Sequence, residues 1–254
     1  MKGRALAVSA MALALVAWSG AACGRSRAST GGGPVTVLAA ASLTEAFTAA
    51  GRALRHAGTG IDTTFSFAGS QQLVAQVKAG APADVVATAD TASMDALVAA
   101  GLVEPPRTFA TNVLELAVRP GNPKHVGGLA DLARADLAVV LADASVPAGR
   151  YATQALDRAG LHVHPKSLEL DVKAAVRKVA SGEADAAVVY ATDVRAAGTT
   201  VAGVAIPDAQ NVRATYPIAV VKASAHAAVA RAFVEAMLHG EGRDALAAQG
   251  FGPP

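Results

Sequence analysis

The fold of this chain is set by one stretch near its beginning, Val35-Thr36-Val37-Leu38-Ala39-Ala40-Ala41-Ser42-Leu43-Thr44-Glu45. The β-branched, apolar start is typical of a buried strand, and a serine followed three residues later by a glutamate is typical of a helix start. We therefore predict a strand that turns directly into a helix, with Ser42 as the N-cap and Glu45 completing a capping box. The free N–H groups of such a helix start can bind an anion.

The same alternation of strand-like and helix-like segments continues to the end of the chain, which predicts an α/β protein with a mostly parallel sheet. The expected strands are Val35–Ala39, Ile61–Phe67, Asp84–Ala87, Val113–Val118, Leu137–Leu141, Ala186–Tyr190, Val201–Ile206 and Ile218–Val221. The expected helices are Leu43–His56, Gln71–Ala79, Thr91–Ala100, Gly128–Arg134, Arg150–Ala159, Val172–Ser181 and Ala225–Leu238.

Prolines lie next to two of these strands. Pro120 and Pro123 follow the strand Val113–Val118, and Tyr216-Pro217 precedes the strand Ile218–Val221. Two such crossings predict two α/β lobes, residues 35–117 with 218–254 and residues 118–217, with a ligand cleft between them. One continuous doubly wound sheet is the alternative.

The first residues have the pattern of an export signal. Lys2 and Arg4 precede an apolar run that is short for a membrane span and ends in small residues, so we expect residues 1–22 to be a cleaved signal peptide. The hydrophilic residues 23–34 predict a flexible tether.

Cys23 is the only cysteine of the chain, and Ala21-Ala22-Cys23 resembles the end of a bacterial lipobox. Gly20 departs from that pattern, in which Leu, Val or Ile is usual. We predict lipidation of Cys23 and a location on the outer face of the cell membrane. The alternative is a periplasmic protein with a free thiol.

The length and the net charge of the chain limit the classes of function that are expected. The 254 residues suffice for one large or two modest domains, and the net charge of +2 is thinly spread. Without a basic patch, nucleic acid is not an expected partner.

Further helix starts repeat the first pattern. Ser70 follows Gly69 and is predicted to be an N-cap, and Pro147 suits a first helical turn in which the N–H of Ala148 stays free. Asp171 is the predicted cap of a helix whose first turn contains the Val172 N–H. Each start could also serve helix capping alone.

Three more side chains near these starts need an interpretation. Tyr190 ends an apolar strand at the sheet edge where α/β proteins bind ligands, so its O–H could donate to a ligand, although an isolated tyrosine at such a position is more often half-buried packing. Arg150 and Lys173 are predicted to be solvated charges on helix faces.

Taken in order, these segments resemble the periplasmic molybdate-binding proteins of ABC transporters, which deliver molybdate or tungstate to a membrane permease. The resemblance spans most of residues 35–254, and its most specific pieces are Val37–Thr44, Ala79–Val85, Val146–Gly149, Val189-Tyr190 and Tyr216–Val221. It implies a type II periplasmic-binding-protein fold, in which two crossover strands join the lobes. It also implies a monomeric receptor with a permease as partner, no catalytic residue, no cofactor and no metal cation.

The resemblance further implies a ligand set: the hydroxyl and N–H of Ser42 and of Ser70, the N–H of Ala148 and of Val172, and the O–H of Tyr190. At Gly69-Ser70-Gln71 the chain departs from the family, which often has several serines in a row here. Because all these groups are neutral donors, fully ionised dianions should be favoured over protonated phosphate. Sulfate stays possible, so a sulfate receptor is the nearest alternative.

Other function classes have less support. Neither serine lies in a Gly-x-Ser-x-Gly elbow and no histidine can be tied to them, so an enzyme is not expected. His162 and His164 lack a third ligand at metal spacing and are expected to be surface histidines. A ligand-sensing domain of a transcription regulator could share the fold, but the export signal argues against it.

Overall fold

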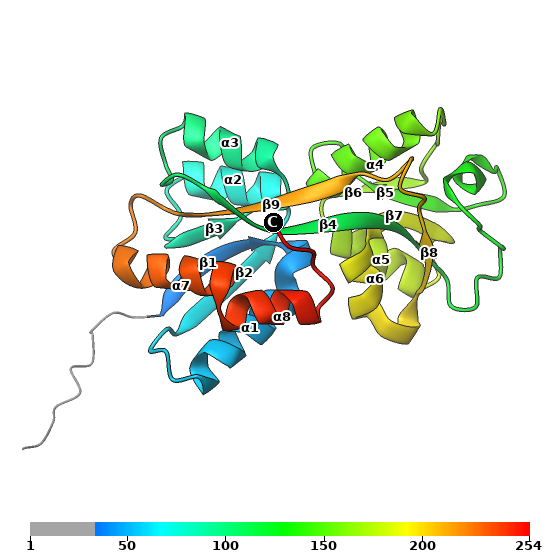
Figure 1. Ribbon diagram of the computed structural model, residues 1–254. Helices are drawn as coiled ribbons and strands as arrows, with labels where there is room; N and C mark the ends of the chain where they lie inside the picture. The colour runs from blue at the N-terminus through cyan, green and yellow to red at the C-terminus, as the bar shows by residue number, and fades with distance from the viewer. Residues whose placement is uncertain (1–33) are drawn as a thin grey trace, which may run out of the picture. The chain divides into compact units, whose positions relative to one another are not determined.

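The computed structural model describes residues 34–254, so the predicted signal peptide, Cys23 and nearly all of the tether lie outside the described residues. The strands are β1 Val35–Ala40, β2 Thr63–Ala68, β3 Val85–Ala87, β4 Arg107–Val118, β5 Val139–Ala142, β6 Ser167–Glu169, β7 Ala186–Tyr190, β8 Ala202–Ala205 and β9 Arg213–Val220 (Figure 1). The α-helices are α1 Thr44–His56, α2 Ser70–Lys78, α3 Thr91–Ala99, α4 Pro147–Arg158, α5 Val172–Ala180, α6 Ala191–Ala197, α7 Ala227–His239 and α8 Glu241–Ala248. Short 3₁₀ helices are η1 Ala41–Leu43, η2 Leu129–Ala133 and η3 Gly198–Thr200.

The strands follow the order β2-β1-β3-β9-β4-β7-β5-β6, with β8 also paired to β4. β1 is parallel to β2 and β3, and β5 is parallel to β6 and β7. Every antiparallel pairing involves β4 or β9. The prediction of a mostly parallel sheet is therefore wrong. The two long strands, β4 and β9, are antiparallel to their neighbours and to each other.

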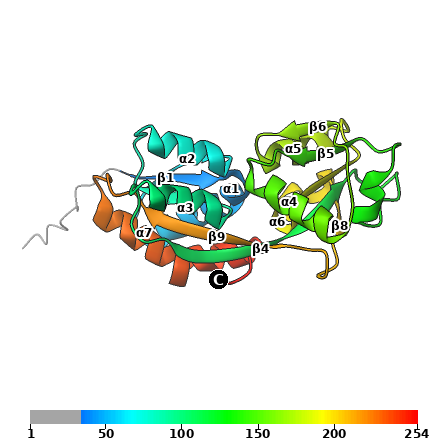
Figure 2. The same cartoon turned by 90° about the horizontal axis from the view of Figure 1, so that it is seen from above.

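β4 and β9 join two lobes (Figures 1 and 2). The first lobe contains β1, β2, β3 and β9, with α2 and α3 on one face of its sheet and α1, α7 and α8 on the other. The second lobe contains β5 to β8, with α4 on one face and α5 and α6 on the other. β4 is shared, because Arg107–Val113 pairs with β9 whereas Leu114–Val118 lies between β7 and β8. The α/β class with two crossover strands is confirmed, and the residue limits of the lobes stay a prediction.

Several elements differ from the sequence pattern. β6, α6 and α8 are not predicted: β6 is a three-residue edge strand, α6 follows β7 directly, and only Gly240 separates α8 from α7. The helix expected over Gly128–Arg134 is the 3₁₀ helix η2. β4 and β9 begin well before their predicted starts, because polar residues interrupt the apolar pattern in the first half of each strand.

An aromatic chain runs from the core of the first lobe towards the second. Phe47 of α1 is fully buried, and its ring centroid lies 5.7 Å from that of Phe109 in β4. Phe109 in turn meets Tyr216 of β9 edge-on at 6.4 Å, and Tyr216 meets Tyr190 of β7 at 5.8 Å. These separations are typical of favourable aromatic pairs, so β4, β7 and β9 are fixed to one another where they cross.

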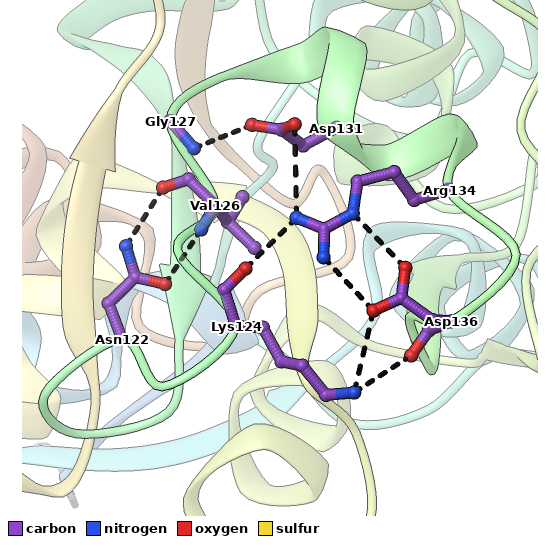
Figure 3. Close-up of polar contacts among 7 residues, drawn as sticks. All are labelled: Asn122, Lys124, Val126, Gly127, Asp131, Arg134 and Asp136. Carbon is purple, nitrogen blue, oxygen red and sulfur yellow. Dashed lines mark hydrogen bonds and ion pairs between the residues drawn. The ribbon is translucent and has the colours of Figure 1, made fainter.

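The connection from β4 to β5 is held by its own polar contacts (Figure 3). Asn122, with a φ of 48°, donates from Nδ2 to the Val126 carbonyl and accepts from the Val126 N–H, both at 2.9 Å. The Arg134 guanidinium bonds both oxygens of Asp136 at 3.1 and 3.0 Å and the Lys124 carbonyl at 2.9 Å. This segment lies apart from the cavity described below.

Within residues 34–254 no helix has both the length and the apolar character that a membrane span requires.

A buried carboxylate joins β3 to the segment before α7. Asp84 accepts from the Thr36 N–H at 2.8 Å and from Ser224 Oγ at 2.6 Å, and the Nδ1 atom of His226 lies 3.3 Å away. Burial raises the pKa of this carboxyl, but the hydrogen bonds from Ser224, Thr36 and His226 outweigh it, so the pKa of Asp84 lies below its ordinary 3.8.

We predict that Asp84→Asn lowers the melting temperature near neutral pH by several degrees, because it removes the charge from hydrogen bonds that are together worth about 1–3 kcal/mol. Since the folded-state pKa is lowered, this stabilisation is present above the ordinary pKa of 3.8 and is lost as the pH falls through the lowered value. The difference from the unmodified chain should therefore shrink in acid, measured by circular dichroism. Asp208→Asn, at an exposed aspartate, is the control. A gap that widened in acid would contradict the assignment.

Candidate anion site between the two lobes

The residues predicted to form the ligand site line one small cavity where the lobes meet. Its lining consists of Ala40, Ala41, Ser42, Gly69, Ser70, Ala89, Val146, Pro147, Ala148, Asp171, Val172 and Tyr190. Ser42 and Ser70 come from the first lobe, whereas Ala148, Val172 and Tyr190 come from the second. The cavity has a volume of about 10 Å³. Pockets for drug-sized ligands span roughly 300–1,000 Å³, so this cavity is far too small for such a ligand and suits only a small ion.

Three helices begin at this cavity. α2 begins at Ser70, α4 at Pro147 and α5 at Val172. The first N–H groups of a helix have no partner within it, and the helix dipole makes this end positive. Ala148, the second residue of α4, and Val172, the first of α5, therefore offer N–H groups as the sequence predicts.

The predicted cap at Ser42 is wrong. The 3₁₀ helix η1 lies between β1 and α1, so Ser42 is inside that turn and the N-cap of α1 is Leu43, without a side-chain cap. Glu45 completes no capping box and instead contacts Lys173. The extra turn frees the Ser42 hydroxyl from capping and brings it to the cavity wall.

The predicted cap at Ser70 is wrong by one residue. Gly69 is the N-cap of α2, and its N–H donates to Gln72 Oε1 at 3.0 Å. A Cβ at Gly69 would lie 2.6 Å from the Leu170 carbonyl oxygen, so a side chain there would collide with the other lobe. Ser70 consequently keeps its hydroxyl for the cavity.

Both cavity serines also form a hydrogen bond to a residue of their own lobe. Ser70 Oγ accepts a hydrogen bond from the Ala89 N–H at 3.0 Å, and Ser42 Oγ lies 3.0 Å from Tyr216 Oη. Ser42 is 4% exposed and Ser70 1%, so neither hydroxyl is a solvent-facing group. A serine whose oxygen accepts from a buried donor can direct its own hydrogen into the cavity.

Tyr190 provides a further donor. The side chain is 1% exposed, and its Oη has no hydrogen-bond partner among the residues that the structure describes. Burial raises the pKa of Tyr190 well above its ordinary range, with smaller contributions from neighbouring Tyr216 and Tyr151, so the phenol keeps its proton near neutral pH. An unpaired buried O–H costs about 1–3 kcal/mol, which an anion's oxygen would recover.

The second-lobe helices begin as predicted, with a proline in the first turn of α4 and Asp171 as the cap of α5. Pro147 is the first residue of α4, and Asp171 Oδ1 accepts from the Ala174 N–H at 2.8 Å at the start of α5. Gly149 packs so closely that a Cβ would lie 2.0 Å from the Asp143 carbonyl oxygen. Only glycine allows the first turn of α4, with Ala148, to lie against the end of β5.

The predictions that Arg150 and Lys173 are solvated are wrong. Arg150 Nε donates to Asp90 Oδ2 at 2.9 Å, and Lys173 Nζ donates to Glu45 Oε2 at 2.7 Å. Both contacts join the second lobe to the first. Helical periodicity does not show that these faces turn towards the other lobe, so sequence reasoning missed Asp90 and Glu45 as partners.

Lys173 also lies 3.2 Å from the fully buried Asp193 Oδ1. Burial raises the pKa of Asp193 to about 6, and the charge of Lys173 opposes that rise. Lysine and arginine are absent from the cavity lining among the described residues, because the nearest cations are bound to carboxylates outside it. The cavity therefore presents neutral donors and one carboxylate, that of Asp171, whose Oδ1 accepts from the Ala174 N–H as the cap of α5.

The histidines that the sequence places near one another, His162 and His164, are both exposed between α4 and β6, as expected of surface histidines. Over residues 34–254, groups of three or more side chains able to hold a metal cation are absent. The cavity is thus the site to which the sequence and the geometry both point.

The lobes and the cavity define a solute-binding protein, and comparison with known sequences agrees. A family model of bacterial extracellular solute-binding proteins matches residues 35–252, so the chain belongs to that family. It is 42% identical over 241 residues to the molybdate-binding protein ModA of Mycobacterium bovis, covering 92% of each chain. It is 32% identical over 209 residues to ModA of Escherichia coli, covering 78% of this chain and 80% of that one. Both relatives are named as binding proteins, which agrees with the prediction that this chain is a binding protein.

Solved structures show the same fold. The periplasmic molybdate-binding protein of Azotobacter vinelandii is similar with a TM-score of 0.76 at 23% identity, covering 87% of this chain and 99% of that one. The sulfate-binding protein SubI of Mycobacterium tuberculosis is similar with a TM-score of 0.76 at 23% identity, covering 87% and 86%. At these identities the likeness concerns the fold alone.

We predict that Arg150→Met lowers the free energy of unfolding by about 1–3 kcal/mol, because it leaves the carboxylate of Asp90, which is 5% exposed, without its cation. Chemical denaturation measures this change, and small-angle X-ray scattering should show a larger radius of gyration as the lobes separate. Adding Asp90→Asn should recover part of the loss, because asparagine is neutral and still caps α3. Arg243→Met, at an exposed arginine of α8, is the control. Equal effects of Arg150→Met and the control would count against an interlobe bond.

Proposed function

We propose that this protein is the extracytoplasmic receptor of an ABC transporter for molybdate, and for tungstate, and that it delivers the oxyanion to a membrane permease. The observation that carries the proposal is the convergence of neutral donors from both lobes on one small cavity. The 42% identity to a protein named for molybdate binding supports it. Molybdate is then the cargo and not a cofactor.

The proposed ligand set is the one that the sequence predicts: Ser42, Ser70, Ala148, Val172 and Tyr190. Counting the hydroxyl and N–H of each serine, these residues supply about seven donors, each worth roughly 1.5–3 kcal/mol to a charged acceptor before the costs of binding. Neither lobe alone holds the anion, because the two serines belong to the first lobe and the other donors to the second. Residues 35–117 with 218–254, and residues 118–217, are the proposed lobes.

The proposed selectivity follows from the proposed ligand set, because the carboxylate of Asp171 in the lining is engaged as the cap of α5. A protonated oxyanion has to direct its O–H at an acceptor, and the proposed set contains only donors, so molybdate is favoured over phosphate near neutral pH. Sulfate is also a tetrahedral dianion and is the second candidate, favoured by the same neutral donor set. The size of the cavity then decides between sulfate and molybdate.

We predict that calorimetric titration of the purified protein gives sub-micromolar binding of molybdate and tungstate, with sulfate weaker and phosphate undetected. Ser42→Ala with Ser70→Ala should abolish tight binding while leaving the circular dichroism spectrum intact. Ser145→Ala, at an exposed serine beside the cleft, is the control. A preference for sulfate would assign the protein to sulfate transport, and unchanged affinity in the double variant would remove the assigned site.

The receptor is proposed to be exported as a monomer and held at the membrane. Residues 1–22 would act as the signal peptide, Cys23 as the lipidated residue and residues 23–34 as the tether. The sequence supports this, because Cys23 is the only cysteine and directly follows small residues.

We predict that Cys23→Ser moves the protein from the membrane fraction to the soluble fraction, because it removes the attachment point of the lipid. Immunoblotting of both fractions measures the change, with Ser26→Ala as the control. Equal membrane association of the two variants would exclude the anchor.

A further inference from the structure

The segment Gly69-Ser70-Gln71, where the chain departs from the expected run of serines, forms a direct contact between the lobes. Gln71 is the second residue of α2, and its Nε2 donates to the Leu170 carbonyl at 2.9 Å. Leu170 belongs to the second lobe and directly precedes Asp171, the cap of α5. The hydrogen bond therefore joins the start of α2 to the start of α5.

The direction of this hydrogen bond is fixed by its two groups. A main-chain carbonyl can only accept and an amide nitrogen can only donate, so the Gln71 amide has to face Leu170 with Nε2. The other atom of that amide, Oε1, is buried and has no partner among the residues that the structure describes. Turning the amide over would place two acceptors together, so the contact with Leu170 sets its orientation.

Gly69 leaves the space in which this contact forms. A Cβ at Gly69 would lie 2.6 Å from the Leu170 carbonyl oxygen and 2.6 Å from both polar atoms of the Gln71 amide. The Gly69 backbone itself, with a φ of −60° and a ψ of 141°, is open to any residue. Alanine therefore suits the backbone of the first lobe, whereas its Cβ would collide with the second lobe when the two meet.

Gln71 lies outside the lining of the cavity. Ser70, its neighbour in α2, and Val172, two residues after Leu170, do line it. Gln71 instead lines a separate groove between the lobes, together with Arg150 of α4. The hydrogen bond to Leu170 thus acts on the position of two groups in the proposed ligand set, without a contact to the ligand.

We propose that Gln71 is a positioning residue that holds the starts of α2 and α5 together across the cavity and so tightens oxyanion binding without touching the anion. The inference rests on the proposed function and deepens it. Donor and acceptor come from different lobes, so the bond exists only in the closed form, in which the lobes are in contact. A bond present only in that form favours it, and every ligand that needs the closed form gains by the same factor.

The test is Gln71→Met, which keeps the length of the side chain and removes the amide. Affinities for molybdate and tungstate are measured by calorimetry. We expect both to fall by the same factor, about three- to tenfold, as for the loss of one hydrogen bond. Gln76→Met, at an exposed glutamine of α2, is the matched control. Affinities equal to those of the control would overturn the proposal, and so would a changed ratio of the two ligands, which would place Gln71 against the anion.

Gly69→Ala distinguishes a contact between lobes from a role within α2. Its Cβ keeps the Leu170 carbonyl away, so we expect both ligands to bind about 10- to 100-fold more weakly. In this background Gln71→Met should weaken binding no further, because the bond is already absent. A further loss of three- to tenfold would show that Gln71 acts within its own helix and would overturn the proposal.

Gln71→Asn gives the same distinction if Gly69→Ala does not fold. It keeps an amide near the start of α2 but is one carbon too short for Leu170, so it should weaken both ligands as Gln71→Met does. Full affinity in Gln71→Asn would overturn the proposal, because any polar side chain would then suffice.

The outcome separates this proposal from the proposed function. If the unmodified protein binds sulfate and not molybdate, the molybdate assignment fails, and titration with sulfate tests Gln71 in the same way. If it binds no oxyanion, both proposals fail. If it binds molybdate and Gln71→Met matches Gln76→Met, only the role of Gln71 is lost.

Discussion

The organisation of this protein depends on hydrogen-bond donors that have no acceptor within their own elements. The first N–H groups of α4 and α5 and the buried O–H of Tyr190 all meet the same cavity. Each unsatisfied donor costs about 1–3 kcal/mol when it is buried. Under the proposed function, an acceptor-rich occupant would satisfy these donors and would add to the ion pairs that already join the lobes.

Cationic charge is kept out of the cavity, because the nearby cations are paired with carboxylates elsewhere. Arg150 and Lys173 are close in sequence to Ala148 and Val172, yet their cationic groups are bound to carboxylates of the first lobe. A cation in the cavity would attract anions of many kinds, whereas neutral dipoles distinguish ligands by geometry and protonation state. The same ion pairs join the lobes, so two requirements of a selective receptor are served by one set of contacts.

The sequence predicts local features of this fold well and long-range ones poorly. The strand that turns into a helix after Val35, and the starts at Pro147 and Asp171, follow from patterns within a few residues, and they suffice to choose residues that share a cavity. The predicted N-cap at Ser42 is wrong because the 3₁₀ turn that contains Ser42 has no distinct sequence pattern. The hydrogen bond between Ser42 and Tyr216 joins residues that are 174 positions apart in the sequence. The periodic pattern of apolar residues within one helix or strand does not show how two lobes face each other.

The two cavity serines differ in what holds them. Ser70 accepts from a backbone N–H, which persists through almost any substitution at Ala89. Ser42 shares a hydrogen bond with the phenol of Tyr216, whose ring packs edge-on against Phe109 and Phe251. One serine is therefore held by the main chain of its own lobe. The other is held by a side chain of β9, a strand that joins the two lobes, so its position depends on the packing where the strands meet.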